Sequence, residues 1–495
     1  MNWQTIRTMS HVQIGTLLAL LIVVFLPNYN ILKFGPSPAV PAFLLAALGA
    51  WLLWRERLRV FATPAMRRWV VIFLLLFVPV LASIPLSYDP RISVSFAAGL
   101  ALYFFCGVAL IRALRSDAER AWLAKWITVV LLFWVMDSGI QYIFGHDLFG
   151  IAIAMQGRIL GPFADNLRQS VLLLLLMPVM LWWLAARSAA GTMAAFLAAG
   201  VAAMLGGART ILLWLGIVAA ALLIRLPGRR WKWGTLIAIL AVIGMTLAIS
   251  PALQERFGRF TKLGTVTVSF ENLDLLLSRR LTLWDTGLNM IRERPLTGVG
   301  VGAFATAYDN YSTIPDDVFR GRQARQKPHH AHQLYIGMAA ETGLPGLAAL
   351  VLVFVLCMKW YLAAPPPRRD QAWPYAVGLF VYAFPFNSQP VLFTQWLFPV
   401  LLLLLGGMLA ALDDAPTGKA DEKLASLLTA NKRTNHAQSS ERVEPYPAHP
   451  LQPLSRVSAV EGIPCTAARY RGNCGLGDAL RPLRVFHHPH AAETL

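Results

Sequence analysis

The chain has 495 residues and a formal net charge of +18, yet 56% of its residues are hydrophobic and only 14% are charged. A mean hydropathy of +0.54 excludes an ordinary soluble domain and indicates a protein with several membrane spans. The basic residues gather in short loops between apolar runs, so they indicate membrane topology and no nucleic-acid partner.

About twelve apolar runs are long enough, at roughly 20 residues, to be transmembrane helices. The expected fold is an all-α polytopic membrane protein with transmembrane helices 1–9 in residues 1–250 and transmembrane helices 10–12 in residues 333–412. The run 333–362 is expected to form a short helix, then a break, then a span. In chain order the runs lie near residues 12–27, 37–54, 69–86, 92–113, 121–144, 169–187, 190–206, 210–225, 232–250, 333–362, 372–388 and 391–412.

The basic residues favour one side of the membrane. If the spans alternate, the crowded loops all lie on the same side, and the positive-inside rule makes that side cytoplasmic. Both chain termini are then cytoplasmic as well. The crowded loops contain Arg55, Arg57, Arg59, Arg67 and Arg68, then Arg112, Arg115, Arg120 and Lys125, then Arg225, Arg229, Arg230 and Lys232, then Lys359, Arg368 and Arg369.

Two segments lie outside the apolar runs. Residues 251–332 form a long polar loop that the topology places outside the cytoplasm, and it contains a candidate helix at 279–293. Long structured loops commonly carry function, so we expect active-site residues there. Within it, Gly298-Val-Gly-Val-Gly302 follows no strand and precedes no Lys-Ser/Thr, so it predicts a turn that brings backbones close rather than a nucleotide loop. Residues 413–495 are polar, rich in Pro, Arg and Ser, and expected to be a disordered cytoplasmic tail.

The segment 328–346 reads PHHAHQLYIGMAAETGLPG. His332 begins a helix there, and His330 lies two residues before it. The positive end of a helix dipole disfavours imidazolium, so a histidine at this position suits a neutral base that takes a proton from a hydroxyl. The alternative is a loop histidine that only bonds the backbone. The spacing H-H-x-H does not match a usual zinc site.

Arginines near the outer ends of spans are candidates for anion binding. Arg209 follows Gly206-Gly207-Ala208 between two apolar runs, Arg279 and Arg280 precede a helix with one apolar face, and Arg158 lies in an outer loop. Guanidinium groups bind phosphate through two hydrogen bonds and stay charged, so several that converge would suit a pyrophosphate. The alternative for Arg209 is a side chain that extends to the membrane surface. The loop has no Asp-x-Asp pair, so neither a divalent metal nor another cofactor is indicated.

These residues resemble the signature region of bacterial O-antigen ligases and polymerases. The likeness rests on Arg280-Leu-Thr-Leu-Trp284, Pro295-Leu-Thr-Gly298-Val-Gly300-Val-Gly-Ala-Phe304, His332-Gln333 and Glu341-Thr-Gly343-Leu-Pro-Gly346. Arg158-Ile-Leu-Gly161-Pro-Phe163-Ala-Asp-Asn166 resembles the other outer-loop element of the family, and Arg209 matches its arginine before a central span. One departure is Gln333, where Asn is frequent in the superfamily.

The resemblance implies a glycosyltransferase of the bacterial inner membrane, similar to glycosyltransferases of type C, with a periplasmic active site. The donor would be a glycan on undecaprenyl pyrophosphate, and the acceptor a sugar hydroxyl of the lipid A–core oligosaccharide. It also implies that neither a metal nor a nucleotide sugar is needed. By carry-over, His332 would be catalytic and Arg209 and Arg280 would bind the pyrophosphate. Arg158, Asn166, His330 and Arg279 are further candidates.

Three other functions stay open. An O-antigen polymerase uses the same donor with a second lipid-linked glycan as acceptor, and an O-linked protein oligosaccharyltransferase uses Ser or Thr. A flippase for lipid-linked glycans would need a polar pathway through the spans, for which the sequence offers few candidates. The His332-Gln333 to Gly-Leu-Pro-Gly stretch at the start of the tenth span favours the ligase.

Overall fold

The structure is a computed structural model that describes residues 10–27, 37–154, 157–163, 168–207, 210–226, 228–249, 254, 269–315, 317–323, 327–386, 392–394 and 396–413. The chain divides into two units, Met1–Gly418 and Lys419–Leu495, and every described residue belongs to the first. The predicted disordered tail, except Asp413, lies outside the described residues.

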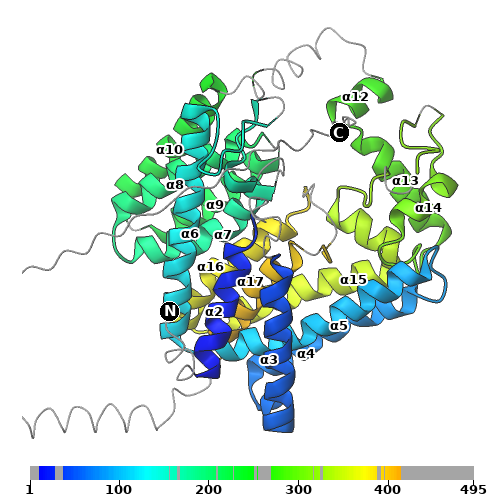
Figure 1. Cartoon of the computed structure of the whole chain (residues 1–495), viewed down its shortest axis with the longest axis horizontal. Helices are drawn as coiled ribbons and strands as arrows, with labels where there is room; N and C mark the ends of the chain where they lie inside the picture. The colour runs from blue at the N-terminus through cyan, green and yellow to red at the C-terminus, as the bar shows by residue number, and fades with distance from the viewer. Residues whose placement is uncertain are drawn as a thin grey trace, which may run out of the picture. The chain divides into compact units, whose positions relative to one another are not determined.

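Helices make up the described part of the chain, which contains two isolated β-bridges but no strand (Figure 1). Each apolar run predicted from the sequence overlaps one of these helices. In order they are α2 (His11–Val24), α3 (Ala39–Glu56), α4 (Pro64–Ser83), α5 (Pro90–Ala113), α6 (Asp117–Phe144), α7 (Arg168–Ala185), α8 (Ala189–Leu205), α9 (Thr210–Arg225), α10 (Arg229–Ile249), α12 (Phe270–Leu276), α13 (Arg280–Glu293), α14 (Phe304–Tyr311), α15 (Leu334–Ala363), α16 (Pro366–Ala383) and α17 (Phe398–Ala411).

Six of these helices, α3 to α7 and α15, are long and apolar enough to cross a membrane. Four shorter apolar helices, α2, α8, α9 and α17, and residues 231–246 of α10 accompany them. The prediction of an all-helical polytopic membrane protein is therefore confirmed. The number of twelve spans and the boundaries of the loop domain at 251–332 stay predictions.

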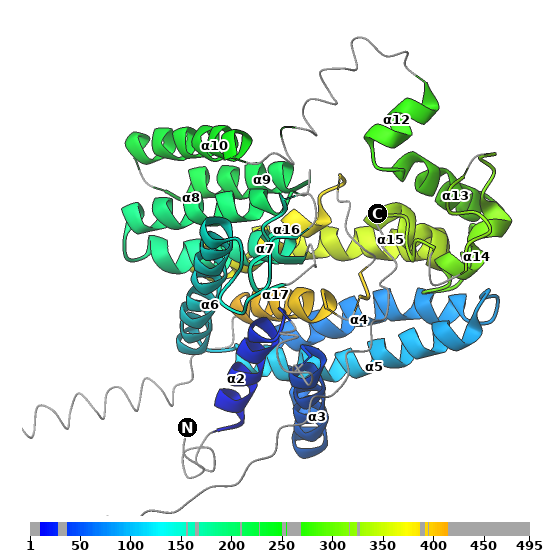
Figure 2. The same ribbon diagram turned by 45° about the horizontal axis from the view of Figure 1, so that its top comes forward.

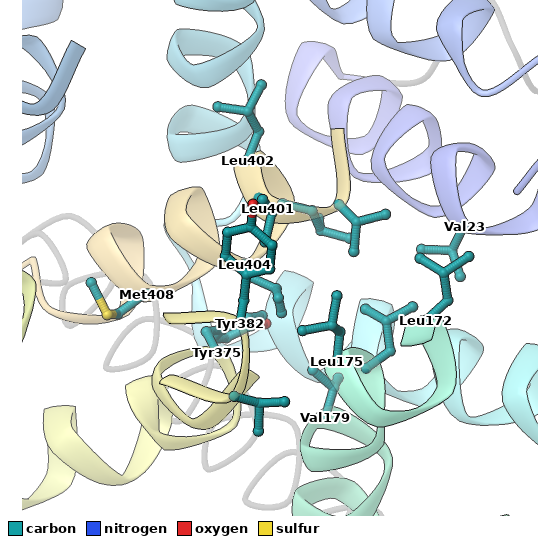
Figure 3. Close-up of a cluster of buried hydrophobic side chains, with 14 of the residues drawn as sticks. Val23, Leu172, Leu175, Val179, Tyr375, Tyr382, Leu401, Leu402, Leu404 and Met408 are labelled. Carbon is teal, nitrogen blue, oxygen red and sulfur yellow. The ribbon is translucent and has the colours of Figure 1, made fainter. Parts of the chain in front are cut away.

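Helices α7, α16 and α17 lie at the centre of the main hydrophobic core (Figure 3). Small residues allow their backbones to approach closely, as is usual where membrane helices pack. A Cβ atom on Gly378 of α16 would lie 2.5 Å from the carbonyl oxygen of Leu175 in α7. A Cβ atom on Gly407 of α17 would lie 2.5 Å from the ring of Tyr375 in α16. Glycine at these two positions therefore fixes the spacing of the central helices.

Contacts between helix ends define a basic end of this unit. Arg112 at the end of α5 lies 2.7 Å from Glu56 at the end of α3. Arg368 at the start of α16 lies 3.5 Å from Asp117 at the start of α6. Next to Arg368, Asp370 lies 2.6 Å from Arg225 at the end of α9. The loops that the positive-inside rule assigned to one side thus come together in space.

The first and last described helices also reach the basic end. The guanidinium of Arg68 at the start of α4 donates to the carbonyl of Leu412, just after α17, at 3.2 Å. His11 at the start of α2 has its ring 6.1 Å from that of Trp51, near the end of α3. Helix α2 therefore begins, and α17 ends, at the same end of the unit. Which side of a membrane that end faces stays a prediction.

A second, smaller hydrophobic core joins α13 and α14 to the start of α15. Its buried members are Leu283, Met290, Val299, Phe304, Ala307, Tyr308, Tyr311, Phe319, Ala331 and Ala340. Figures 1 and 2 show α12, α13 and α14 gathered near the start of α15 and the loop between α4 and α5. The hydroxyls of Tyr88 in that loop and Tyr311 in α14 are 3.0 Å apart, which links this core to the end of the α4–α5 pair.

Candidate functional site

Helix α15 is broken at the position that the sequence predicted. Gly343 has φ 73° and ψ −179°, which interrupts the helix between Leu334 and Ala363. A Cβ atom there would lie 2.5 Å from the carbonyl carbon of Leu296, so only glycine fits. The amide of Leu344, just after the break, donates to the carbonyl of Pro295 at 2.7 Å. The break is therefore held by the segment that follows α13.

The Gly298–Gly302 turn hydrogen-bonds the backbone carbonyls of α15 just before the break. The amides of Val299 and Gly300 donate to the carbonyls of Ala340 and Glu341 at 2.8 and 3.0 Å. The last carbonyls of a helix have no hydrogen-bond donor within the helix, and these two amides supply the missing donors. A Cβ atom on Gly298 would lie 2.5 Å from the carbonyl oxygen of Ala340. The predicted close-backbone turn is thus confirmed, and it packs on the first part of α15.

Gln333 fixes the first turn of α15. Its side-chain oxygen accepts from the amide of Ile336 at 2.5 Å, which makes it the N-cap. Its side-chain nitrogen donates to the carbonyl of Pro385 at 3.1 Å. The hydroxyl of Tyr335 donates to the carbonyl of Ala383 at the end of α16. The start of α15 is therefore tied to the end of α16, and Gln333 caps the helix at the position where the family often has Asn.

His332 precedes this cap in an unusual backbone conformation. Its φ is 49°, in the left-handed region that side chains with a Cβ atom rarely adopt. Its ring lies 4.3 Å from that of His330, centroid to centroid, at an interplanar angle of 54°. A strained non-glycine residue persists only where its surroundings enforce it, and such residues gather at functional sites. The geometry of His332 is thus set by its neighbours.

His330 is partly buried. Burial, with smaller contributions from His332 and His329, lowers the pKa of His330 from 6.5 to about 3. Its Nε2 atom is buried and has no hydrogen-bond partner among the described residues. At physiological pH this imidazole is therefore neutral, and it adds no positive charge beside His332.

Helix α13 places Arg280 on the face that meets the histidine segment. Gly287 of α13 is so close to this segment that a Cβ atom on it would lie 2.7 Å from Ile336 and 3.7 Å from Ala331. Arg280 is the first residue of α13 and precedes Gly287 by seven residues, which is two turns, so both lie on the same face. Arg280 therefore starts the helix face that packs on residues 331–336.

Arg279 has a different environment from its neighbour. It takes a left-handed conformation as the N-cap of α13, and its guanidinium lies 3.6 Å from the buried carboxylate of Asp274. The other contacts of Asp274 hold the same turn, because its carboxylate accepts from the amide and the hydroxyl of Thr282 at 3.1 and 2.6 Å. Arg279 thus joins α12 to α13.

Arg158 lies in a loop that buried polar side chains hold in place. Burial lowers the pKa of Arg158, although a guanidinium stays charged. The Gln141 side-chain oxygen accepts from the amides of Leu160 and Gly161, both at 2.8 Å. The amide of Ile159 donates to the carbonyl of Leu205, the last residue of α8, at 3.2 Å. The loop around Arg158 therefore lies against the end of α8.

Two candidates cannot be placed. Arg209 and Asn166 lie outside the described residues, although α8 ends at Leu205 and α9 begins at Thr210, on either side of Arg209. The structure brings the rings of His330 and His332 together and packs α13, two turns after Arg280, on residues 331–336. Arg158 lies in a separate loop against the end of α8.

Sequence reasoning missed the buried polar residues of α6. Asp137, Ser138 and Gln141 are all buried on this otherwise apolar helix. Asp137 accepts from the amide of Leu148 at 2.8 Å, and Gln141 also donates to the carbonyl of Ile151 at 3.2 Å. Their spacing places them on one face of the helix, and a polar stripe inside an apolar span is a signal that could have identified them.

The fold and this arrangement define a class: a polytopic helical membrane protein with two histidines at the start of a broken helix that packs on α13. Residues 193–351 match the family model described as O-antigen ligase, and no match was found among curated proteins. The match supports the O-antigen ligase superfamily over this segment and includes the motifs from Arg280 to Gly346, whereas the Arg158–Asn166 element lies before it. It includes Arg209, Arg280 and His332 and supports a glycosyltransferase-like enzyme with lipid-linked glycan substrates.

Proposed function

We propose that this protein is an O-antigen ligase that transfers a glycan from undecaprenyl pyrophosphate to a sugar hydroxyl of the lipid A–core oligosaccharide. The observation that carries the proposal is the enforced geometry of His332. Its backbone is left-handed, its ring contacts that of His330, and the next residue caps a helix broken at Gly343. That arrangement gives one imidazole a fixed position beside the α13 face that begins at Arg280.

The proposed site lies on the periplasmic face of the bacterial inner membrane. His332 precedes the start of α15, and the other end of this helix reaches the basic end, where Trp360 lies under the guanidinium of Arg68 at 5.6 Å. The positive-inside rule assigns the basic end to the cytoplasm, together with both chain termini. The opposite end, with His332, then faces the periplasm, where lipid-linked glycans are presented to an acceptor.

The chemistry that we propose is a single transfer. The acceptor hydroxyl oxygen attacks the anomeric carbon of the donor, the carbon–oxygen bond to the pyrophosphate breaks, and undecaprenyl pyrophosphate leaves with the electron pair. His332 takes the hydroxyl proton, a contribution of about 10²–10⁴-fold for a positioned base. Arg280 and Arg209 stabilise the charge that develops on the pyrophosphate, so no metal cofactor takes part in the proposed step.

The further candidates receive distinct roles in this proposal. Neutral His330 supports the ring of His332 without adding charge. Arg158 and Asn166 are assigned to donor binding, Arg158 from the loop that lies against the end of α8. We assign Arg279 to the α12–α13 turn, because Asp274 engages its guanidinium.

Genetic complementation tests the proposal. In a strain that lacks the gene, the wild-type protein should restore polymer on lipid A, whereas His332→Ala should leave lipid-linked polymer to accumulate. The matched control is His329→Ala, an exposed neighbour three residues earlier, which should restore the polymer. Normal smooth lipopolysaccharide with His332→Ala at equal expression would contradict the assignment.

The same experiment separates the related enzymes. Loss of a polymerase leaves a single repeat attached to lipid A, and loss of a protein oligosaccharyltransferase leaves lipopolysaccharide intact but removes glycan from protein. Transfer by the purified protein, given lipid-linked donor and lipid A–core acceptor, excludes a flippase without chemistry.

A further inference from the structure

A cavity of about 430 Å³ lies at the basic end, among the ends of α7 and α9, the last turns of α15 and the start of α16. Its charged lining residues are Arg225, Arg369 and Asp370. It is separate from the His332 segment, because it lies at the opposite ends of α15 and α16. The proposed transfer reaction leaves this cavity unexplained.

The charges of the cavity suit one monoanion. Two arginines and one carboxylate give a formal net charge of +1 among its lining residues. The Arg225 Nη1 atom lies 2.6 Å from Asp370, whose side chain is 53% exposed. A guanidinium has five N–H donors, so one contact with a carboxylate oxygen leaves others to bind an anion. The net charge matches the single negative charge of a phosphodiester.

The other lining residues are those of a membrane interface. Trp373 lies under the guanidinium of Arg225 at 5.0 Å, and Tyr361 also lines the cavity. Tryptophan and tyrosine are enriched where the headgroups of a bilayer begin. Ile224 and Leu226 also line the cavity, and the side chain of Ile224 is 83% exposed. These apolar side chains offer a surface for acyl chains in the same cavity as the two arginines.

We propose that this cavity binds the headgroup of an anionic phospholipid, with the phosphodiester between Arg225 and Arg369 and the acyl chains against Ile224 and Leu226. Basic pockets between transmembrane helices on the cytoplasmic side are a recurrent form of lipid recognition. The bound lipid links α9 to α16 through its phosphate, next to the existing Arg225–Asp370 pair. This inference does not depend on the proposed transferase activity.

The test uses the purified full-length protein in phosphatidylcholine nanodiscs with increasing amounts of phosphatidylglycerol, and native mass spectrometry counts the retained phosphatidylglycerol. Arg369→Gln and Arg225→Gln should each weaken retention about fivefold, the usual contribution of one basic residue at an anionic surface. Arg369→Lys keeps the charge and should retain most of the binding. Asp370→Asn removes the competing carboxylate and should strengthen it.

The matched control is Arg229→Gln, an exposed arginine at the same end that does not line the cavity. Binding unchanged in this control but weakened in Arg369→Gln supports the site. Equal weakening in both would show diffuse attraction and overturn it, as would full retention in the Arg369→Gln and Arg225→Gln variants. Displacement of the lipid by millimolar inorganic phosphate would identify a soluble anion as the ligand instead.

Discussion

At the basic end, arginines pair with carboxylates from other helices, whereas at the opposite end backbone contacts place the candidate catalytic residues. Arg112 and Arg225 reach Glu56 and Asp370 across helix ends. The position of His332, in contrast, follows from the cap at Gln333 and from glycines whose backbones touch α15. Partly exposed ion pairs tolerate small displacements, but glycine contacts with no room for a Cβ atom do not. The comparison predicts that substitutions at the two ends have effects of different size.

The largest effect on transfer activity is expected from replacing Arg280, the second of the two arginines at the start of α13. Arg280→Ala should lower transfer by about 10²–10³-fold, since it removes a group that stabilises developing charge. Arg279→Ala is the matched neighbour. It leaves the buried carboxylate of Asp274 without its ion-pair partner, so it should cost about 1–3 kcal/mol of stability while leaving most of the activity. Transfer assays with the purified variants measure both. Equal loss of activity in the two variants would contradict the separate roles assigned to Arg279, which pairs with Asp274, and to Arg280.

The glycine turn should be the most sensitive structural element. In Gly298→Ala, the new Cβ atom meets the backbone of Ala340 and Glu341 at 2.5 Å, and φ is 64°. We expect a loss of about 1–3 kcal/mol in the free energy of unfolding, together with reduced transfer. Gly99→Ala is the control, because a Cβ atom there meets nothing within 4 Å, and its effect should stay within about 1 kcal/mol. Thermal unfolding in detergent measures both, and equal midpoints would refute the proposed backbone constraint.

A smaller effect is expected from pH. The pKa of His330 is lowered from 6.5 to about 3 by burial, so the unfolded chain binds a proton between these values while the folded protein does not. Its contribution to stability is complete above pH 6.5 and declines as pH falls toward 3, by about 1 kcal/mol one unit below 6.5. His330→Gln should show a smaller drop in the unfolding midpoint between pH 7.5 and 5.5. Thermal unfolding at both pH values measures the drop, and an equal drop in the wild-type protein and His330→Gln would contradict this contribution.

The smallest effect is expected at the basic end. Arg112→Gln breaks a pair with Glu56 in which both side chains are about a quarter exposed, so we expect a loss of about 0.2–1 kcal/mol and unchanged transfer. A double-mutant cycle with Glu56→Gln measures the coupling. If Arg112→Gln lowered the free energy of unfolding as much as Gly298→Ala, the two ends would be equally sensitive to substitution, which would contradict the comparison.

Local signals in the sequence were sufficient for several features. The apolar runs predicted the helices because a membrane span needs a long apolar stretch. The Gly-Leu-Pro-Gly sequence predicted the break at Gly343, and Gly298-Val-Gly-Val-Gly302 predicted a turn that approaches another backbone. These features depend on residues close together in the chain, and their conformational preferences are largely intrinsic.

Other features required contacts between distant residues. The partner of the glycine turn proved to be residues 340–341, about forty positions later. Arg279 and Arg280 look alike in the sequence, but in the structure Arg279 pairs with Asp274. Gln141 of α6 proved to hold the loop around Arg158. No periodicity or spacing states which distant groups will meet, because that depends on how the helices pack.

The sequence by itself determined a helical membrane protein, its family motifs and the kinds of side chain that could carry the chemistry. Only the tertiary structure decided that His332 takes a left-handed backbone beside the ring of His330, and that the start of α15 packs on α13. The physical reason is that an apolar run is stable as a helix in a membrane whatever its neighbours are. The position of a polar side chain at its end, in contrast, depends on the backbones that surround it.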